Sequence, residues 1–351
     1  MKYSIIVPVF NRPDEVDELL ESLSNQTQKD FEVIIVEDGS VKTCKDVCDK
    51  YADIFALHYY AKENSGPGQS RNYGAERANG EWLLILDSDV VLPTGYLEAI
   101  DHSLTSDIVA FGGPDAAHPS FTPVQKAISY SMTSFFTTGG IRGSSPQSGG
   151  TRGALDKFYP RSFNMGTRRD VYLQLGGFSK MRFGEDIDFS YRIVEAGHSP
   201  RLFPEAWVWH KRRTDFKKFF RQVYNSGIAR INLEKRHPGT MKLVHLLPTV
   251  FTVGVIALIL ISAVGRALMH YVDRDQFYWM CFAPWIPILL YSLLICIDST
   301  IKNKSLKVGL LSVPAAFVQL MGYGLGFIES WWKRCVLRQD EFQAFEKTFY
   351  K

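Results

Sequence analysis

Short apolar runs alternate with helical patterns along the first third of the chain. The apolar runs predict strands at residues 4–10, 31–36, 55–60, 83–86 and 108–111. Between the strands, apolar residues recur every three or four positions, which predicts helices near residues 13–23, 43–51, 69–78 and 94–104. Strands that alternate with helices are typical of a mostly parallel, twisted sheet with helices on both faces. The pattern therefore predicts an α/β fold for this part of the chain.

Polar residues follow several of these strands at the point where each strand ends. They are Asn11 and Arg12, Glu37 and Asp38, and Asp87 and Asp89. Side chains at positions i and i+2 of a strand point to the same side, so Asp87 and Asp89 should converge at the carboxyl edge of the sheet. Open α/β sheets bind their ligands at that edge. Two carboxylates there suit a hard divalent cation, which commonly accompanies a phosphate group.

The last third of the chain has a different composition. Three stretches contain no Lys, Arg, Asp or Glu, at residues 243–265, 276–297 and 308–328. Each is close to the ~20 residues that an α-helix needs to cross a bilayer. Trp331 and Trp332 follow the third stretch as interfacial residues would. We expect a membrane region of about three hydrophobic helices over residues 243–330. Three buried helices of a large soluble core are the alternative.

Basic residues predict how this membrane region is oriented. Residues 211–242 are dense in Lys and Arg, and residues 216–233 mix them with apolar residues, which predicts an amphipathic helix on anionic headgroups. Basic segments favour the cytoplasmic side, so we expect the preceding domain in the cytoplasm, anchored to the cell (inner) membrane by several passes. Three crossings would place the tail, residues 331–351, outside, although Lys333, Arg334 and Arg338 favour the inside. The alternative is therefore that one of the three stretches is re-entrant or lies in the membrane interface.

Composition narrows the classes of partner. The net charge is +3 at pH 7, which gives no indication of a nucleic-acid partner. The five cysteines are odd in number and lack the spacing of a disulfide framework, as expected in a reducing compartment. Cys44 and Cys48 lie one helical turn apart, but no second Cys or His pair accompanies them, so we expect buried or idle thiols. The partners we expect are a small-molecule substrate and membrane lipids.

Seven short motifs follow one another in a fixed order. They are Ile-Val-Pro-Val-Phe-Asn at 6–11, Val-Glu-Asp-Gly-Ser at 36–40, Gly-Gln-Ser-Arg-Asn at 68–72, Asp-Ser-Asp at 87–89, Phe-Asn-Met-Gly at 163–166, Gly-Gly-Phe at 176–178 and Gly-Glu-Asp at 184–186. This ordered set resembles the signatures of family 2 inverting glycosyltransferases with the GT-A fold. The resemblance covers roughly residues 1–240. The apolar stretches resemble the C-terminal membrane anchors that are common among bacterial members of that family.

The resemblance implies a nucleotide-sugar site, with UDP as the expected nucleotide. It implies that the donor is bound by Pro8, Asn11, Asp38, Arg71 and Asp87. Asp38 matches the contact to the base, Arg71 a contact to the base or phosphates, and Asp87 a contact near the ribose. Asp89 matches the ligand of a divalent metal, Mn²⁺ or Mg²⁺, and His210 is a candidate second ligand. The alternatives are a turn residue at Asp38, a solvated helix charge at Arg71 and a packing histidine at His210.

The resemblance also implies a catalytic pair, Asp186 and Glu185. A neutral hydroxyl is a poor nucleophile, so a general base must take its proton as the new bond forms. Asp186 matches that base, while Glu185 would hold a neighbour or the start of a helix. An acidic helix N-terminus that is favourable with the helix dipole is the alternative. The glycine-rich residues 139–153 predict a loop that closes over the donor, or else a plain flexible insertion.

Three functions remain open at this point. The first is a membrane-anchored inverting glycosyltransferase that acts on a hydroxyl of a glycan or lipid-linked acceptor, in polysaccharide biosynthesis. The second is a polyprenyl-phosphate glycosyltransferase, whose anionic acceptor needs no base. The third is a non-catalytic membrane protein that binds nucleotide sugars or serves assembly. The expected domains are residues 1–210 (catalytic), 211–242 (basic and interfacial), 243–330 (membrane) and 331–351 (tail).

Overall fold

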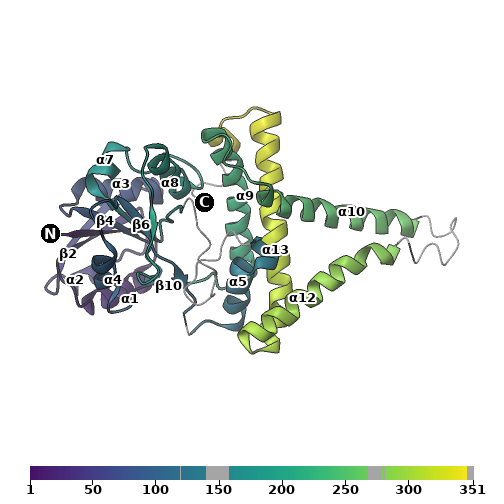
Figure 1. Cartoon of the computed structure of the whole chain (residues 1–351), viewed down its shortest axis with the longest axis horizontal. Helices are drawn as coiled ribbons and strands as arrows, with labels where there is room; N and C mark the ends of the chain where they lie inside the picture. The colour runs from purple at the N-terminus through teal and green to yellow at the C-terminus, as the bar shows by residue number, and fades with distance from the viewer. Residues whose placement is uncertain (119, 140–157, 268–278, 280, 346–351) are drawn as a thin grey trace. The chain divides into compact units, whose positions relative to one another are not determined.

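A computed structural model describes residues 1–351 except 119, 140–157, 268–278, 280 and 346–351 (Figure 1). The chain forms two compact units, and it passes between them more than once. Unit 1 comprises Met1–His118, Ser144–Lys211 and Phe345–Lys351, and unit 2 comprises Pro119–Gly143 and Arg212–Ala344. The predicted catalytic domain, 1–210, included residues 119–143, which the structure instead groups with unit 2.

Unit 1 is built on a seven-stranded sheet in the order β3-β2-β1-β4-β8-β6-β9. The strands are β1 (Tyr3–Val9), β2 (Phe31–Asp38), β3 (Ala56–Lys62), β4 (Trp82–Leu86), β6 (Ala110–Gly112), β8 (Asn164–Arg168) and β9 (Arg201–Leu202). Every pairing is parallel except those of β8, which runs antiparallel to β4 and β6. The expected α/β sheet is confirmed, and the antiparallel strand β8 is an addition to it.

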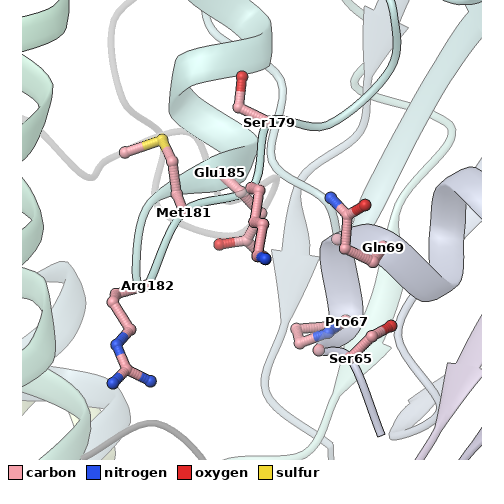
Figure 2. A pocket seen from close by; sticks show the side chains of 10 residues that line it. Ser65, Pro67, Gln69, Ser179, Met181, Arg182 and Glu185 are labelled. Atoms are coloured by element: carbon pink, nitrogen blue, oxygen red, sulfur yellow. The ribbon is translucent and has the colours of Figure 1, made fainter. Parts of the chain in front are cut away.

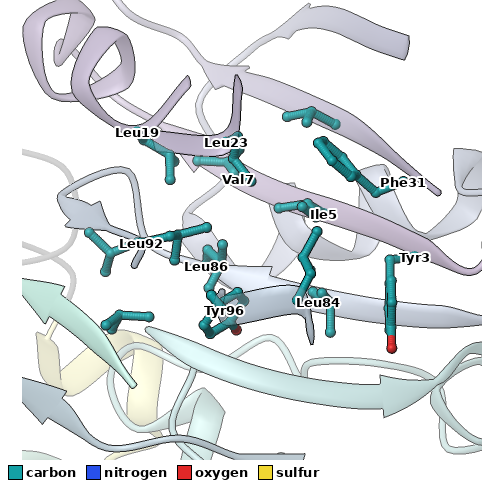
Figure 3. Close-up of a cluster of buried hydrophobic side chains, with 14 of the residues drawn as sticks. Tyr3, Ile5, Val7, Leu19, Leu23, Phe31, Leu84, Leu86, Leu92 and Tyr96 are labelled. Atoms are coloured by element: carbon teal, nitrogen blue, oxygen red, sulfur yellow. The ribbon is translucent and has the colours of Figure 1, made fainter. Parts of the chain in front are cut away.

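Helices cover both faces of this sheet. They are α1 (Pro13–Ser24), α2 (Lys45–Asp49), α3 (Pro67–Arg77), α4 (Tyr96–Ser103), α7 (Arg169–Gln174) and α8 (Glu185–Glu195). Alternate residues of each strand belong to two separate cores, because successive side chains point to opposite faces of the sheet. Ile5 and Val7 pack with Leu19 and Leu23 of α1 and with Tyr96 of α4 (Figure 3). On the other face, the core includes Ile6, Ala75, Tyr172, Phe178 and Phe189.

A small second sheet lies within the same unit, in the order β5-β10-β7. It consists of β5 (Val90–Val91), β10 (Val208–His210) and β7 (Asp115–Ala116). The register sets His210 opposite Val90 and Val208 opposite Asp115. Residues from three distant parts of the chain therefore meet directly after β4. These strands are only two or three residues long, which is too short for an apolar pattern to predict them.

Unit 2 is helical throughout the part of it that the structure describes. Its elements are α5 (Pro123–Thr133), α6 (Phe135–Thr138), α9 (Phe216–Arg236), η2 (Leu243–His245), α10 (Leu247–Ala267), η3 (Ala283–Trp285), α12 (Ile286–Asn303), α13 (Leu306–Trp331), the π-helical turn η4 (Trp332–Val336) and α14 (Glu341–Phe345). Three helical segments are long and apolar enough to cross a membrane, at Leu243–Ala267, Ala283–Asn303 and Leu306–Val336. These correspond to the three predicted stretches, although the start of the second, at 276–278, lies outside the described residues.

One further expectation for this region has a different outcome, and another falls mostly outside the described residues. The helix expected at 216–233 forms as α9, but its apolar face packs inside unit 2, where Phe219 and Val223 contact Ile128 and Met132 of α5. An apolar face that is covered by protein is not free to enter lipid. The prediction that residues 211–242 bind anionic headgroups therefore remains only for their basic face. The predicted closing loop, 139–153, lies outside the described residues from 140 onward.

Candidate active site

The turn between β4 and β5 carries the two carboxylates of the Asp-Ser-Asp motif. The five residues of β4 are all buried, and Val90 N–H donates to the carbonyl of Asp87 at 3.4 Å, which makes the turn tight. Val90 then starts β5 and pairs with β10. Lys211, directly after β10, donates its N–H to the carbonyl of Asp89 at 3.1 Å. The backbone pairing therefore fixes Asp89 beside the end of β10.

His210, the last residue of β10, faces these carboxylates. Its Nε2 lies 3.3 Å from Asp89 Oδ1, and its Nδ1 lies 3.8 Å from Asp115 Oδ2. The ring stacks on Phe163, with the ring centroids 5.0 Å apart. One potential ligand atom from each of Asp87, Asp89 and His210 lies within 4.8 Å of the others. Two carboxylate oxygens and one imidazole nitrogen at this spacing suit Mn²⁺ or Mg²⁺, with Mn²⁺ accepting the nitrogen more readily.

Asp89 is kept ionised by its surroundings. Its side chain is 8% exposed, and Arg12 Nη1 lies 2.6 Å from its Oδ2. Burial alone would raise the pKa of Asp89, but the hydrogen bond and charge of His210 and the charge of Arg12 hold that pKa well below its usual range. A deprotonated, partly buried carboxylate is what a metal ligand requires. The donor set therefore fits a divalent cation.

Arg71 joins this cluster to the carboxylates at the start of α8. Its Nη2 lies 2.8 Å from Asp87 Oδ1, and its Nη1 lies 3.0 Å from Glu185 Oε1. The Arg71 side chain is only 4% exposed, and its guanidinium lies over the ring of Phe178. Burial raises the pKa of Glu185 against the lowering effect of Arg71, and nearby Asp186 raises it further. The buried guanidinium thus links Asp87 of the Asp-Ser-Asp motif to Glu185 at the start of α8, the two regions in which site residues were predicted.

Asp186 is the second residue of α8, and it is held by a different arginine. Its Oδ2 lies 2.9 Å from Arg161 Nε, and its side chain is 15% exposed. Gly184, the residue before the helix, has φ +87°, a left-handed conformation that lets the chain turn directly into α8. Asp188, two residues further on, bonds to Arg192 and Ser179 and is buried. Of the acidic residues in this first turn, Asp186 is therefore the one that pairs with the exposed Arg161.

Asp38 lies at the end of β2, and both of its carboxylate oxygens accept bonds from one loop. Oδ1 accepts from Lys62 Nζ at 2.6 Å and from the N–H of Ser65 at 2.8 Å, and Oδ2 accepts from the N–H of Gly66 at 2.9 Å. This loop leads into α3, which carries Arg71. The Asp38 side chain therefore orders the loop before α3, a structural role that is compatible with contact to a base.

Asn11 has a similar structural role directly after β1. It adopts φ +56°, and its side-chain oxygen accepts the N–H groups of Val41 and Lys42 at 2.8 and 2.9 Å. These bonds tie the ends of β1 and β2 together. Pro8 lies within β1, paired in register with Val36 of β2. Asn11 and Pro8 thus lie at the expected edge of the sheet, where Asn11 orders the loop after β2.

A pocket opens between the start of α3 and the segment before α8 (Figure 2). Its lining includes Ser65, Gln69, Ser179, Arg182 and Glu185. The enclosed volume is about 20 Å³, which is room for about one water. Glu185 lines this pocket and also bonds to Arg71, so the pocket adjoins the predicted catalytic pair. A sugar-sized group would require its walls to move.

The structure brings most of the predicted residues into one linked cluster. Asp87, Asp89 and His210 lie together, and Arg71 ties Asp87 to Glu185, next to Asp186. Three contributors were not among the predicted site residues, namely Asp115, Lys62 and Arg161. Arg12 was noted only for its place after a strand. Asp115 and Arg161 reach the site through non-local strand and helix packing, which leaves no local signal in the sequence.

Family models match most of the chain. The model of glycosyl transferase family 2 matches residues 4–158, and the model of glycosyl transferase family group 2 matches residues 82–296. A pre-mycofactocin glycosyltransferase of Mycobacterium tuberculosis H37Rv is 26% identical over 286 residues, which cover 76% of this chain and 53% of that protein. An uncharacterised glycosyltransferase of Haemophilus influenzae is 47% identical over 87 residues, or 24% of this chain and 29% of that protein. The chain thus spans about half or less of these relatives' length.

Solved structures share the fold at low identity. A mannosyltransferase of Pyrobaculum calidifontis, PcManGT, solved with GDP-Man and Mn²⁺, superposes with a TM-score of 0.59 at 14% identity and covers 95% of this chain and 88% of its own. Residues 1–349 of TarS from S. aureus, solved with UDP-GlcNAc, give a TM-score of 0.50 at 17% identity, with 93% and 90% covered. The second family model alone covers more than half of the chain. The chain therefore belongs to the family 2 glycosyltransferases.

Proposed function

We propose that this protein is a membrane-anchored, inverting glycosyltransferase. It moves a sugar from a nucleoside diphosphate donor, a UDP-sugar in the simplest case, to a hydroxyl of a glycan or lipid-linked acceptor. The observation that carries the proposal is the Arg71 bridge, which joins Asp87 on the metal side to Glu185 beside Asp186. A single reaction centre can use both sets of carboxylates only when they lie close together. Arg71 holds Asp87 and Glu185 close by contacts of 2.8 and 3.0 Å.

On the donor side, Asp89 and His210 are the residues that would hold Mn²⁺ or Mg²⁺. When bound, the cation neutralises the negative charge that builds on the leaving diphosphate. Arg12 helps to keep Asp89 ionised, and Arg71 orients Asp87 for this task. Asp87 is placed to meet the ribose, and Asp38 with Lys62 to meet the base. Asn11 and Pro8 form the edge of the sheet next to Asp38.

On the acceptor side, Asp186 is the general base. It takes the proton of the acceptor hydroxyl as the hydroxyl oxygen bonds to the anomeric carbon, while the bond from that carbon to the diphosphate oxygen breaks on the opposite face. A single displacement of this kind inverts the anomeric centre and needs no covalent sugar–enzyme intermediate. Arg161 orients the carboxylate of Asp186. Glu185 holds Arg71 and the start of α8.

The comparisons support this donor class and metal. PcManGT was solved with GDP-Man and Mn²⁺, and TarS with UDP-GlcNAc. Both ligands are nucleoside diphosphate sugars, and the Asp-Asp-His group here suits the same kind of ion. The three apolar helices support membrane anchoring. The basic residues 211–242, which precede the first of these helices, support a cytoplasmic catalytic unit at the cell (inner) membrane.

Turnover of a panel of UDP- and GDP-sugars by the purified full chain tests the proposal. We expect slow hydrolysis of one donor, which stops on chelation and returns with Mn²⁺ or Mg²⁺. With an acceptor fraction from membranes, Asp186→Asn should lower transfer by about 10²- to 10⁴-fold, the usual contribution of a general base. Donor binding, measured by calorimetry, should persist. The anomeric configuration of the product, read by NMR, should be opposite to that of the donor.

The two alternatives give different results in the same assays. A polyprenyl phosphate acceptor is already anionic, so Asp186→Asn would cost such an enzyme only a modest factor. A non-catalytic protein would turn over no donor even as the wild type. Asp188→Asn is a matched control, because Asp188 lies on the same helix but is buried against Arg192 and Ser179. Equal losses in both variants would point to a folding defect, and retained configuration would exclude direct displacement.

A further inference from the structure

The three apolar helical segments of unit 2 differ in what covers them. In the most apolar stretch of the segment that contains α13, 44% of the residues are buried within the protein, against 11% in those of α10 and α12. Large apolar side chains are exposed along the whole of α10 and α12, among them Val253, Ile259, Leu260, Leu289, Leu293 and Ile297. Between residues 315 and 330, α13 has no exposed residue. Among the described parts of these three segments, only α10 and α12 therefore present a continuous apolar surface that lipid would have to cover.

The long helix α9 runs beside α13 in the same direction (Figure 1). Close approaches occur in register: a Cβ on Gly322 would meet Val223, and a Cβ on Gly326 would meet the carbonyl of Tyr224 at 2.1 Å. Further along, Ser330 donates to the carbonyl of Ile228, and Arg334 Nε donates to Asn232 Oδ1 at 2.8 Å. The pair thus stays in contact over about three turns of each helix.

Charges on α9 exclude it from the hydrocarbon core of a bilayer. Its 21 residues include seven charged ones, which are Lys217, Lys218, Arg221, Arg230, Glu234, Lys235 and Arg236. The cations at 217, 218, 221, 235 and 236 are all exposed, so burying α9 in hydrocarbon would bring these charges into contact with lipid. Charged side chains are rare in membrane-crossing helices and face a protein interior when they occur there. Since α9 cannot cross, a helix packed parallel to it along its length cannot cross either.

We infer that only α10 and α12 cross the bilayer, and that α13 lies with α9 along the membrane surface. Each crossing helix contacts α13 at one end, α10 near its start and α12 near its end: Thr252 Oγ1 contacts the carbonyl of Leu320 at 3.3 Å, and Ser299 bonds to Ser312 at 2.7 Å. Figure 1 shows α10 and α12 leaving α13 on the same side. They form a hairpin, so the chain returns to the side from which it entered.

This topology accounts for the charges after α13. With two crossings, Lys333, Arg334 and Arg338 lie on the same side as the basic helix α9, as the distribution of basic residues around membrane segments favours. Trp331 and Trp332, both about half exposed, then lie at the level of the headgroups. The partner of this surface is an anionic bilayer, which matches the cations of α9. The inference rests on the proposed membrane location, and not on the transfer reaction.

The side on which Cys335 is exposed tests the inference in the full-length chain. Cys335 is the exposed cysteine directly after α13, whereas Cys44, Cys48 and Cys281 are buried. In sealed vesicles of known orientation, a membrane-impermeant maleimide should label Cys335 at least tenfold more in inside-out than in right-side-out vesicles. Ile54→Cys, made on a Cys335→Ser background, reports the side of unit 1, and it should give the same preference.

Opposite preferences for the two cysteines would overturn the inference, because they require an odd number of crossings. If Cys335 reacts from neither side, reporters fused after Lys351 decide: a fluorescent protein folds inside, and alkaline phosphatase is active outside. Release of the chain by alkaline carbonate would also overturn it, since no helix would then cross. These results do not depend on catalysis, so an inactive protein with both cysteines inside would sink the proposed function and leave this topology standing.

Discussion

At the scale of single residues, the site is a balance of charges. Four carboxylates pair with three guanidinium groups in the contacts described: Asp89 with Arg12, Asp87 and Glu185 with Arg71, and Asp186 with Arg161. Asp115 faces the imidazole of His210. A divalent cation between Asp87, Asp89 and His210 would add a strong positive charge to this acidic cluster.

His210→Gln tests the metal role of the imidazole. The substitution removes the nitrogen ligand but keeps a polar side chain of similar reach. We expect the Mn²⁺ concentration for half-maximal donor hydrolysis to rise by roughly 10- to 100-fold, the range seen when a metal site loses part of its support. Any preference for Mn²⁺ over Mg²⁺ should shrink, because carboxylates alone suit Mg²⁺. Metal titrations of hydrolysis measure both effects. His102→Gln, on the exposed side of α4, is the control, and an unchanged titration would exclude His210 as a ligand.

Some of these site residues could be predicted from the sequence and others could not, for physical reasons. Asp87 and Asp89 follow a buried apolar strand, so their position at the sheet edge could be predicted locally. His210 was a candidate only through the family resemblance, and its place beside Asp89 depends on the pairing of β5 with β10. Arg161 had no signal, because its contact with Asp186 is set by packing alone. Asp38 was predicted from its motif, while its bonds to the loop before α3 were not.

At the scale of elements, the strands that could be predicted are those with long apolar runs. β1, β2 and β4 are almost entirely buried, so their composition shows them. β8 has the sequence Asn-Met-Gly-Thr-Arg, which contains one large apolar residue, and it could not be predicted. A Cβ on Gly166 would overlap the ring of Phe111 on β6, so β8 is placed by a close backbone approach rather than by hydrophobicity.

Glu32 ties β2 to its neighbours and should make stability depend on pH. Its buried carboxylate accepts bonds from Ser4 Oγ at 2.5 Å and Asn79 N–H at 2.7 Å, and His58 Nε2 lies 3.3 Å away. Burial would raise the pKa of Glu32, but these bonds outweigh it and lower that pKa below the usual 4.5. The unfolded chain then binds the proton more tightly than the folded chain. The contribution of Glu32 is therefore present above about pH 4.5 and is lost as the pH falls through the folded value.

Glu32→Gln should consequently destabilise the protein in a pH-dependent way. We expect a loss of about 1–3 kcal/mol at pH 7, because the amide offers fewer acceptors to the donors around it. The gap to the wild type should narrow below about pH 4.5, as the wild-type carboxyl takes up its proton. Pulse proteolysis of the full chain in detergent measures both values. Glu21→Gln, on the exposed side of α1, should show no such dependence, and a pH-independent gap would contradict this account.

At the scale of the whole molecule, the two units are interleaved in sequence. The chain leaves unit 1 after His118, contributes α5 and α6 to unit 2, and returns to unit 1 before it enters unit 2 again at Arg212. Composition marked the start of the apolar region near residue 243, but nothing in the composition of residues 119–143 marked them as part of the second unit. Their side chains show it, because Ala127 packs with Val308 and Ala315 of α13.

A truncated chain of residues 1–211 should therefore behave poorly in solution. In the whole protein, Ile128 and Met132 of α5 are buried against Phe219 and Val223 of α9, and the truncation removes α9. The exposed apolar face should bind a hydrophobic dye and drive association, which light scattering after size exclusion would detect. The double substitution Ile128→Ser and Met132→Ser should restore a monomer. Leu173→Ser, which removes an apolar side chain already exposed on α7, should not. A monomeric truncation that binds no dye would show that α5 does not need unit 2 to cover it.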